Sequence, residues 1–122
     1  GVSALYTPMT AEELAFGTVA LTLESGEMTL PVAQMRLDTS VSMTGLLVEQ
    51  VQLPDPKGEN TAVTLYCTQE GIPVTLRLEK AGEGMDPSSL VGKRIDVKGL
   101  VDCFAGSYQI RILSNQGIII EN

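Results

Sequence analysis

The sequence predicts a mainly β protein, and three observations lead to this fold class. Turn-forming pairs interrupt the chain at short intervals, among them Ser25-Gly26, Glu70-Gly71 and Ala105-Gly106. The segments between the turns are rich in Val, Ile, Leu, Thr and Tyr, and their apolar residues often occupy alternate positions. Helical signals are few and short. Alternation with a period of two is typical of antiparallel strands that bury one face, so we expect a sheet or barrel.

The first forty residues carry two local signals. Thr10 before the segment 11–14 (AEEL) predicts a short helix, because threonine is a good N-cap and acidic residues suit a first turn. Residues 18–30 are predicted to form a hairpin about Ser25-Gly26, and the proline that follows confines the second arm to a sheet edge. Residues 31–37 fit either a short helix or an edge strand.

We assign residues 1–40 to an N-terminal extension, whose role has three alternatives. The extension could add an edge hairpin to the main β unit or cap one end of that unit with Leu14 and Phe16. It could also serve as an arm that pairs with a partner or with a second copy of the chain. The sequence alone leaves all three alternatives open.

Residues 41–122 are predicted to form the main β unit. The expected order is a long strand, a loop, a strand, a tight turn, a strand, a short helix, a strand, a turn and a strand. Asp86 before Pro87, with Gly92 as a stop, predicts the short helix. The alternating residues expected to face the core are Val41, Met43 and Leu46 or Leu47; Val63, Leu65 and Cys67; Val74, Leu76 and Leu78; Ile95 and Val97; Tyr108, Ile110 and Ile112.

Residues 90–112, LVGKRIDVKGLVDCFAGSYQIRI, resemble the OB-fold (oligonucleotide/oligosaccharide-binding fold) domains of nucleic-acid-binding and bacterial accessory proteins. A short helix ends in Val-Gly-Lys, a strand reads apolar-x-apolar-x-Gly, and a glycine-containing turn precedes Tyr-Gln-Ile. Gly45 and Gly99 stand where a small barrel needs a bulge or sharp curvature. The resemblance, over roughly 80 residues, implies a five-stranded OB-like Greek-key barrel with a short helix between strands three and four.

The same resemblance implies where a ligand would lie. OB-fold domains usually bind on the outer face of strands two and three, beside the loops that join strands one to two and four to five. Those loops correspond to residues 53–60 and 102–107. The outward-facing positions of the two strands are Thr64, Tyr66, Thr68, Thr75, Arg77 and Glu79. The candidate ligand-binding residues are Tyr66, Arg77, Phe104, Tyr108 and Lys57.

Four of these candidates also have a purely structural interpretation, which we favour. Tyr66 fits a cross-strand packing role with an exposed hydroxyl group, and Arg77 fits a cross-strand partner for a neighbouring carboxylate. Phe104 would close one end of the barrel, and Tyr108 would lie at the edge of the core. Asp55 in the loop is expected to stabilise a turn rather than to hold calcium.

Composition narrows the functional classes. The chain has 8 Lys and Arg against 15 Asp and Glu, a net charge of −7, and it contains no histidine. Histidine-based acid–base and nucleophilic catalysis are therefore excluded, and no carboxylate pair stands at a catalytic spacing, so we expect no enzyme. A polyanion binder normally presents a basic face, which the acidic balance disfavours. We expect no cofactor, no metal site and no transmembrane segment.

The two cysteines, Cys67 and Cys103, lack the CxxC spacing of metal and redox sites. Both occupy inward positions of their strands, but at opposite ends of the expected barrel. A disulfide requires Cα atoms within about 7 Å, so two separate buried thiols are favoured over a bridge.

The sequence therefore predicts a non-catalytic binding or accessory module whose ligand is a protein or a small molecule. The alternative is a single-stranded nucleic-acid binder that uses Tyr66, Arg77, Phe104 and Lys57. The chain starts at Gly1-Val2-Ser3, without an initiator methionine. Removal of a secretion or lipoprotein signal, or of another domain, would explain this start. The localisation thus stays open, although a location outside the cytoplasm is favoured. The oligomeric state also stays open.

Overall fold

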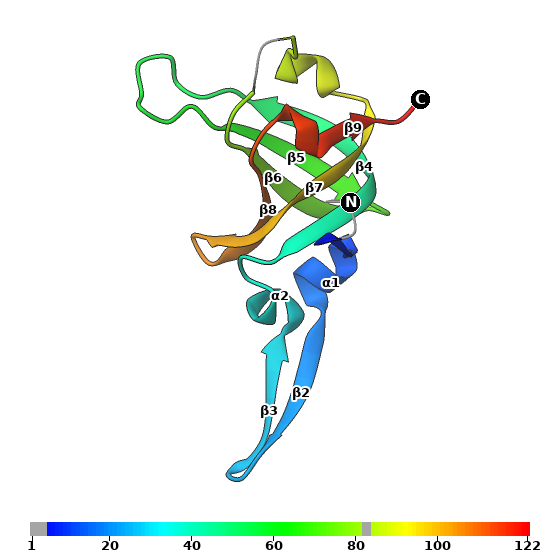
Figure 1. The fold of residues 1–122 in the computed structure, drawn as a ribbon, viewed down its shortest axis with the longest axis vertical. Coiled ribbons are helices and arrows are strands. Elements are labelled where there is room, and N and C mark those ends of the chain that lie inside the picture. Colours follow the sequence, from blue (N-terminus) through cyan, green and yellow to red (C-terminus); the bar gives the residue numbers. More distant parts are fainter. Residues whose placement is uncertain (1–4, 82–83) are drawn as a thin grey trace.

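The computed structural model describes residues 5–81 and 84–122. A β-barrel forms the main body, and a slender hairpin projects from one end of it (Figure 1). The predicted extension begins at residue 1, so its first four residues lie outside the described part.

Five strands form the barrel. They are β4 (Ser40–Gln52), β5 (Val63–Gln69), β6 (Ile72–Leu78), β7 (Arg94–Phe104) and β8 (Ser107–Ile112). Their order is β4-β5-β6-β8-β7, and β4 also pairs with β7, which closes the sheet on itself. All neighbours are antiparallel except β6 and β8, which are parallel. The predicted mainly β class and five-stranded barrel are confirmed.

Strand β4 is long enough to pair with two neighbours because it bends at Gly45. Gly45 has a φ of +67°, in the left-handed region that favours glycine. The β4–β7 register shifts between Met43 and Leu46, which is the bulge that the sequence predicted here. The extra residue also changes the alternation, so Leu46 rather than Leu47 is the buried leucine.

The barrel interior contains the apolar residues that the alternation predicted. Leu46, Leu65, Leu76, Leu78, Ile95, Ile110 and Ile112 are fully buried. Leu90 joins them from the 3₁₀-helix η2 (Pro87–Leu90), which lies between β6 and β7 as expected. The Asp86 side chain caps η2 by accepting from the Ser88 N–H at 3.1 Å.

The start of the extension packs against the barrel. Strand β1 (Thr7–Pro8) pairs in parallel with β4, and helix α1 (Ala11–Phe16) follows it. Thr10 and Glu13 form the reciprocal capping box of α1. Leu14 is buried in the core, as a cap of the barrel end requires, but Phe16 is 68% exposed. In the alternative that caps the barrel end with Leu14 and Phe16, the part assigned to Phe16 is wrong, because Phe16 is the last residue of α1, where the chain leaves the barrel.

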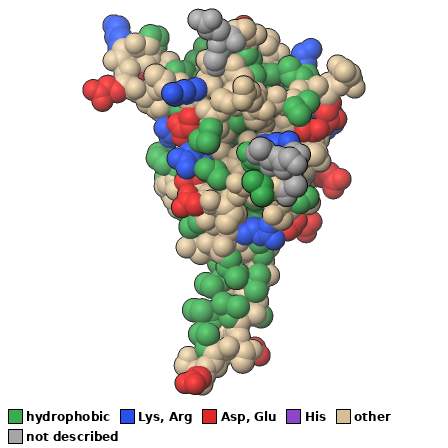
Figure 2. Space-filling model, viewed as in Figure 1, with side chains coloured by type: hydrophobic (Ala, Val, Ile, Leu, Met, Phe, Trp, Pro, Cys, Tyr) green, Lys and Arg blue, Asp and Glu red, His purple; other side chains and the backbone are tan. Residues whose placement is uncertain are grey.

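The predicted hairpin exists, but it is not part of the barrel sheet. Strands β2 (Thr18–Leu23) and β3 (Gly26–Pro31) form a separate two-stranded sheet. The short helix α2 (Val32–Met35) follows, so the middle of residues 31–37 is helical, while Pro31 ends β3. The chain then returns to the barrel at Leu37, which bridges to Val101. Figure 2 shows hydrophobic side chains along the hairpin and acidic side chains at its tip.

The C-terminal segment adds a short strand that the sequence analysis did not predict. The 3₁₀-helix η3 (Asn115–Gly117) leads into β9 (Ile118–Ile120). Strand β9 pairs with the first part of β7, at Ile95 to Val97, whereas β8 pairs with the last part. Among the described residues, no helix has both the length and the apolar character needed to cross a membrane.

Both cysteines are free, but only Cys67 is buried. Cys103 was expected to be buried because it has the inward parity of β7. It is exposed because β4 covers β7 only as far as Leu100 and Leu37 bridges to Val101, so that from Asp102 onward β7 pairs with β8 alone.

This difference predicts selective thiol chemistry. Burial, with a smaller contribution from Glu49, raises the pKa of Cys67 to about 12. We expect Ellman's reagent at about pH 8 to modify one thiol per native chain and two after denaturation. The variant Cys103→Ser should abolish the native reaction. Rapid modification of Cys67 in the folded variant would contradict this placement.

Candidate functional site

The outer face of β5 and β6 presents two of the predicted ligand-binding residues close together. Tyr66 pairs with Thr75, and the neighbouring pair toward the β4–β5 loop is Thr64 with Arg77. Tyr66 is 39% exposed and its hydroxyl group donates to Oε1 of Gln52 on β4 at 2.9 Å. The ring therefore lies on the outer face, and its hydroxyl group is held by the adjacent strand.

Arg77 has both a carboxylate and an amide neighbour. Its Nε lies 3.3 Å from Oε1 of Glu79, and its Nη2 donates to Oδ1 of Asn60 at 3.3 Å. The carboxylate partner was predicted, but Glu79 directly follows Leu78, the last residue of the strand that contains Arg77, and does not belong to a neighbouring strand. The distance between Arg77 Nε and Glu79 Oε1 is that of an ion pair, but the geometry of the contact is not that of a hydrogen bond. The buried Nε atom therefore has no hydrogen-bond partner.

A second arginine, which was not among the predicted site residues, lies beside Arg77. The parallel register of β6 and β8 places Arg77 directly next to Arg111. Neighbouring strands are about 4.8 Å apart, so two guanidinium side chains leave the barrel from adjacent positions. The Nε atom of Arg111 is also buried without a hydrogen-bond partner. Within residues 5–81 and 84–122, Glu79 is the only carboxylate within 4.0 Å of either guanidinium group.

The loop that joins β4 to β5 borders this face and contains Lys57. Asp55 stabilises a turn in the loop, because its Oδ1 accepts from the Lys57 N–H at 2.9 Å and its carbonyl oxygen accepts from the Gly58 N–H at 2.9 Å. This is the turn role predicted for Asp55. Asn60 belongs to the same loop and contacts Arg77, so the loop is tied to the outer face.

The remaining two candidates lie elsewhere. Tyr108 packs against the core, and its hydroxyl group donates to Oε1 of Gln34 at 2.9 Å, which fits the predicted place at the core edge. Phe104 is 61% exposed at the end of β7, so the prediction that it closes the barrel is wrong. It lies four residues beyond Leu100, the β7 neighbour of Arg111, or about 13 Å along the strand.

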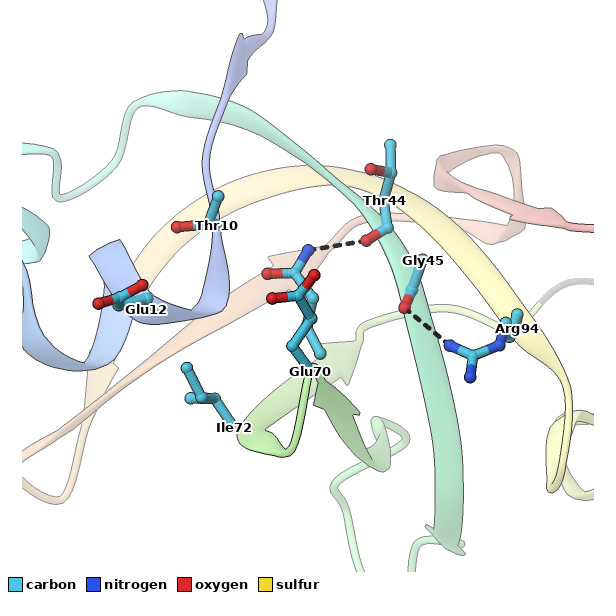
Figure 3. Close-up of a pocket in the computed structure, with 8 residues that line it drawn as sticks. Thr10, Glu12, Thr44, Gly45, Glu70, Ile72 and Arg94 are labelled. Carbon is cyan, nitrogen blue, oxygen red and sulfur yellow. Dashed lines mark hydrogen bonds between the residues drawn. The ribbon is translucent and has the colours of Figure 1, made fainter.

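A cavity lies at another place, where α1 meets the barrel. It measures about 450 Å³. Figure 3 shows its walls coming from α1, from the bend of β4 and from the β5–β6 turn, with Arg94 to one side. Its lining residues are Thr10, Glu12, Thr44, Gly45, Gln69, Glu70, Ile72 and Arg94. None of the five predicted site residues lines this cavity.

Several polar groups of the cavity already have partners. The Gln69 amide accepts from the Ala11 N–H and donates to the Thr44 carbonyl oxygen, both at 2.7 Å. Arg94 donates to the Gly45 carbonyl oxygen at 3.4 Å. The bond from Ala11 attaches α1 to the barrel, and the other two link barrel strands to each other. We therefore interpret the cavity as a structural junction and place the candidate site on the outer face.

A pair of carboxyl groups meets beside this junction. The Gly45 N–H donates to Oδ1 of Asp96 at 3.0 Å and to Oε2 of Glu121 at 3.1 Å. The hydrogen bond between the two carboxyl groups requires a proton, and it is the main cause that raises the pKa of Glu121. The folded chain therefore holds this proton at pH values where the unfolded chain has lost it.

This pair predicts how stability depends on pH. Because the pKa of Glu121 is raised on folding, its contribution is most favourable below the ordinary glutamate pKa and is lost as the pH rises through the folded value. We expect Glu121→Gln to raise Tm relative to the wild type more at about pH 7 than at about pH 4, measured by differential scanning calorimetry. The control is Glu24→Gln at the hairpin turn. An equal effect of Glu121→Gln at both pH values would refute the shared proton.

The chemistry available to the outer face is recognition of an anion. Two adjacent guanidinium groups, an exposed aromatic ring and a loop lysine provide charge, hydrogen-bond donors and a stacking surface. The described residues contain no group of three or more Cys, Asp or Glu side chains arranged to hold a metal ion. No protein-family model matches the chain, and no curated protein matches it significantly.

Proposed function

We propose that the chain is a non-catalytic binding module of the OB-fold type that holds an acidic group of a protein or small-molecule ligand on the outer face of β5, β6 and β8. The observation that carries this proposal is the adjacent pair Arg77 and Arg111, whose buried Nε atoms have no hydrogen-bond partner. Buried donors are normally satisfied, and two neighbouring cations repel each other. A carboxylate or phosphate group beside the two guanidinium groups would supply the opposite charge, and side chains that turn toward it would gain acceptors for their Nε atoms.

The strand order supports the choice of this face. The barrel is closed in the order β4-β5-β6-β8-β7, with η2 between β6 and β7, which is compatible with an OB-fold. Its second and third strands are β5 and β6, the strands on which OB-fold domains usually bind. The loop with Lys57 and Asn60 then corresponds to one of the two loops that flank such ligands.

A protein or small acid suits this face better than a nucleic acid does. Glu79 contacts Arg77. Glu49 lies on β4, the neighbour of β5, and its Oε1 accepts from the hydroxyl group of Thr68 on β5 at 3.3 Å. A strand of phosphates would meet these carboxylates on a chain with a net charge of −7. A single acidic group needs only the two arginines.

The second candidate function is single-stranded nucleic-acid binding, which the exposed ring of Tyr66 beside the arginines favours. Bases stack on aromatic side chains with about 1–3 kcal/mol per base. The two candidate functions differ in how many residues of the outer face the ligand would contact. A nucleic acid would need Tyr66 and Lys57 as well as the arginines, whereas a local acidic group would not.

Fluorescence anisotropy distinguishes the two. The probes are a labelled hexaglutamate peptide and labelled single-stranded DNA and RNA, titrated at about 50 and 200 mM salt. The proposal predicts peptide binding that Arg77→Ala and Arg111→Ala each weaken about tenfold, and that Lys93→Ala, an exposed cation elsewhere, leaves unchanged. Tighter, salt-sensitive binding of the oligonucleotides that Tyr66→Ala abolishes would favour the alternative. Binding of neither probe class would contradict both.

A further inference from the structure

The hairpin of β2 and β3 lacks the packing that normally keeps such an element folded. Its two strands pair only with each other, and neither belongs to the barrel sheet. At its base, the Val32 N–H donates to the Gly17 carbonyl oxygen at 2.8 Å. A two-stranded hairpin is only marginally stable in water unless further strands or a packed face support it. The projecting hairpin in Figure 1 therefore indicates an interaction surface.

One face of the hairpin is aliphatic. The register places Val19 opposite Leu30, Leu21 opposite Met28 and Leu23 opposite Gly26, all on the same face. The other face carries Thr18, Ala20, Thr22, Glu27, Thr29 and Pro31. Leu23 is 45% exposed and Met28 is 44% exposed. An amphipathic sheet with an uncovered apolar face is typical of a docking element.

The two edges of the hairpin differ in how well their residues block pairing with a further strand. Strand β2, TVALTL, contains no charged residue and no proline, whereas β3, GEMTLP, contains Glu27 and Pro31. Charges and prolines are the residues that block pairing at a sheet edge. The free edge of β2 is therefore the one suited to strand addition.

The positions of the free backbone groups on β2 follow from Pro31. Proline has no N–H, so the pair of Thr18 with Pro31 is a non-hydrogen-bonded pair. Hydrogen-bonded and non-hydrogen-bonded pairs alternate along an antiparallel ladder, so Ala20 and Thr22 also belong to non-hydrogen-bonded pairs. Their backbone N–H and C=O groups consequently point away from β3, toward the free edge.

We propose that a second copy of this chain pairs with that edge, so that two β2 strands lie antiparallel about a two-fold axis. Centring the pairing on Ala20 places Ala20 opposite its own copy and Thr18 opposite Thr22 of the copy. All of these residues direct free backbone groups outward, so both partners can exchange hydrogen bonds. The product is a four-stranded sheet whose aliphatic residues lie on one side, and four strands give the support that a lone hairpin lacks.

The charges fit this arrangement. A β2 strand without charged residues pairs with itself without like-charge contacts. Glu24 and Glu27 lie at the hairpin tip, and the antiparallel orientation places the two tips at opposite ends of the sheet, about 20 Å apart. This distance exceeds the Debye length of about 8 Å at physiological salt. Each acidic tip also lies toward the base of the other hairpin, the part of the extension that contains Arg36, its single basic residue.

Sedimentation equilibrium of the full chain at micromolar concentrations tests the proposal. The wild type should be a dimer, and Ala20→Pro should raise the dissociation constant at least about tenfold by removing an outward N–H. The matched control is Thr29→Pro, because Thr29 is the partner of Ala20 on β3 and loses an outward N–H at the other edge. We expect the control to remain dimeric. A monomeric wild type, or equal effects of the two prolines, would overturn the proposal and leave the hairpin to a different partner.

A cross-linking variant tests the register. The two Ala20 residues would form a hydrogen-bonded pair, whose Cα atoms lie about 5.5 Å apart, within the range of a disulfide. We expect Ala20→Cys in the Cys103→Ser background to form a disulfide-linked dimer on mild oxidation. The same substitution at Thr29 should not, and efficient linkage through residue 29 alone would show that the other edge is the interface.

Discussion

Replacing Gly99 with alanine should destabilise the fold by roughly 3 kcal/mol. Gly99 lies on β7 opposite Val41, at an inward position where the backbone of β8 passes close by. A Cβ atom at this position would lie 2.5 Å from the carbonyl oxygen of Arg111 and 2.8 Å from Cγ2 of Ile110. The carbonyl group is part of the β7–β8 ladder, so it moves only at the cost of pairing in the closed barrel.

Urea denaturation measures this effect. The matched control is Gly58→Ala in the β4–β5 loop, where a Cβ atom would lie 3.4 Å from the Asp55 carbonyl oxygen, an ordinary contact. We expect the control to change the free energy of unfolding by less than about 0.5 kcal/mol. If both variants unfold at the same urea concentration, the close approach of β7 and β8 is not a constraint on the fold.

Removing the Leu90 side chain should have an effect of similar size. Leu90 is the last residue of η2 and is fully buried among core residues, although it comes from a helix and not from a strand. We expect Leu90→Ala to cost about 3 kcal/mol through lost apolar burial and the cavity that remains, and to lower Tm by about 10 °C.

The neighbouring residue provides the control for that prediction. Val91 is 50% exposed, so Val91→Ala removes methyl groups that are largely in water and should change Tm only slightly. Thermal unfolding followed by circular dichroism compares the two variants. Similar Tm values for Leu90→Ala and the wild type would show that η2 does not close the barrel core.

The strands and helix caps were predictable because their causes are local. Alternating apolar residues identify a buried face within a single strand, and Asp86 before Pro87 identifies a helix start without knowledge of its neighbours. Gly45 also predicted the bulge in β4. The same bulge made Leu46 and Leu47 indistinguishable from sequence, since a simple alternation does not reveal where an extra residue is inserted.

The parts that sequence reasoning missed depend on distant segments. Arg111 became part of the candidate site only through the parallel pairing of β6 with β8, which joins residues far apart in the chain. The signal was present, because Arg111 has outward parity on the fifth strand and an OB-fold places that strand beside the third. Cys103 was misplaced because parity alone does not show where the covering strand β4 ends. Phe104 was misplaced because its position near a turn does not show whether the ring folds back over the barrel end.

The most direct test of the proposed function observes the two arginines themselves. Inorganic phosphate is titrated into the ¹⁵N-labelled chain, and the Nε–Hε resonances of Arg77 and Arg111, assigned through their alanine variants, are followed by NMR. The account predicts that both resonances shift together and saturate, while Arg36 shows only the weak, linear shift expected of a salt effect. Shifts of Arg77 and Arg111 no larger than that of Arg36 would contradict an anion site on the outer face.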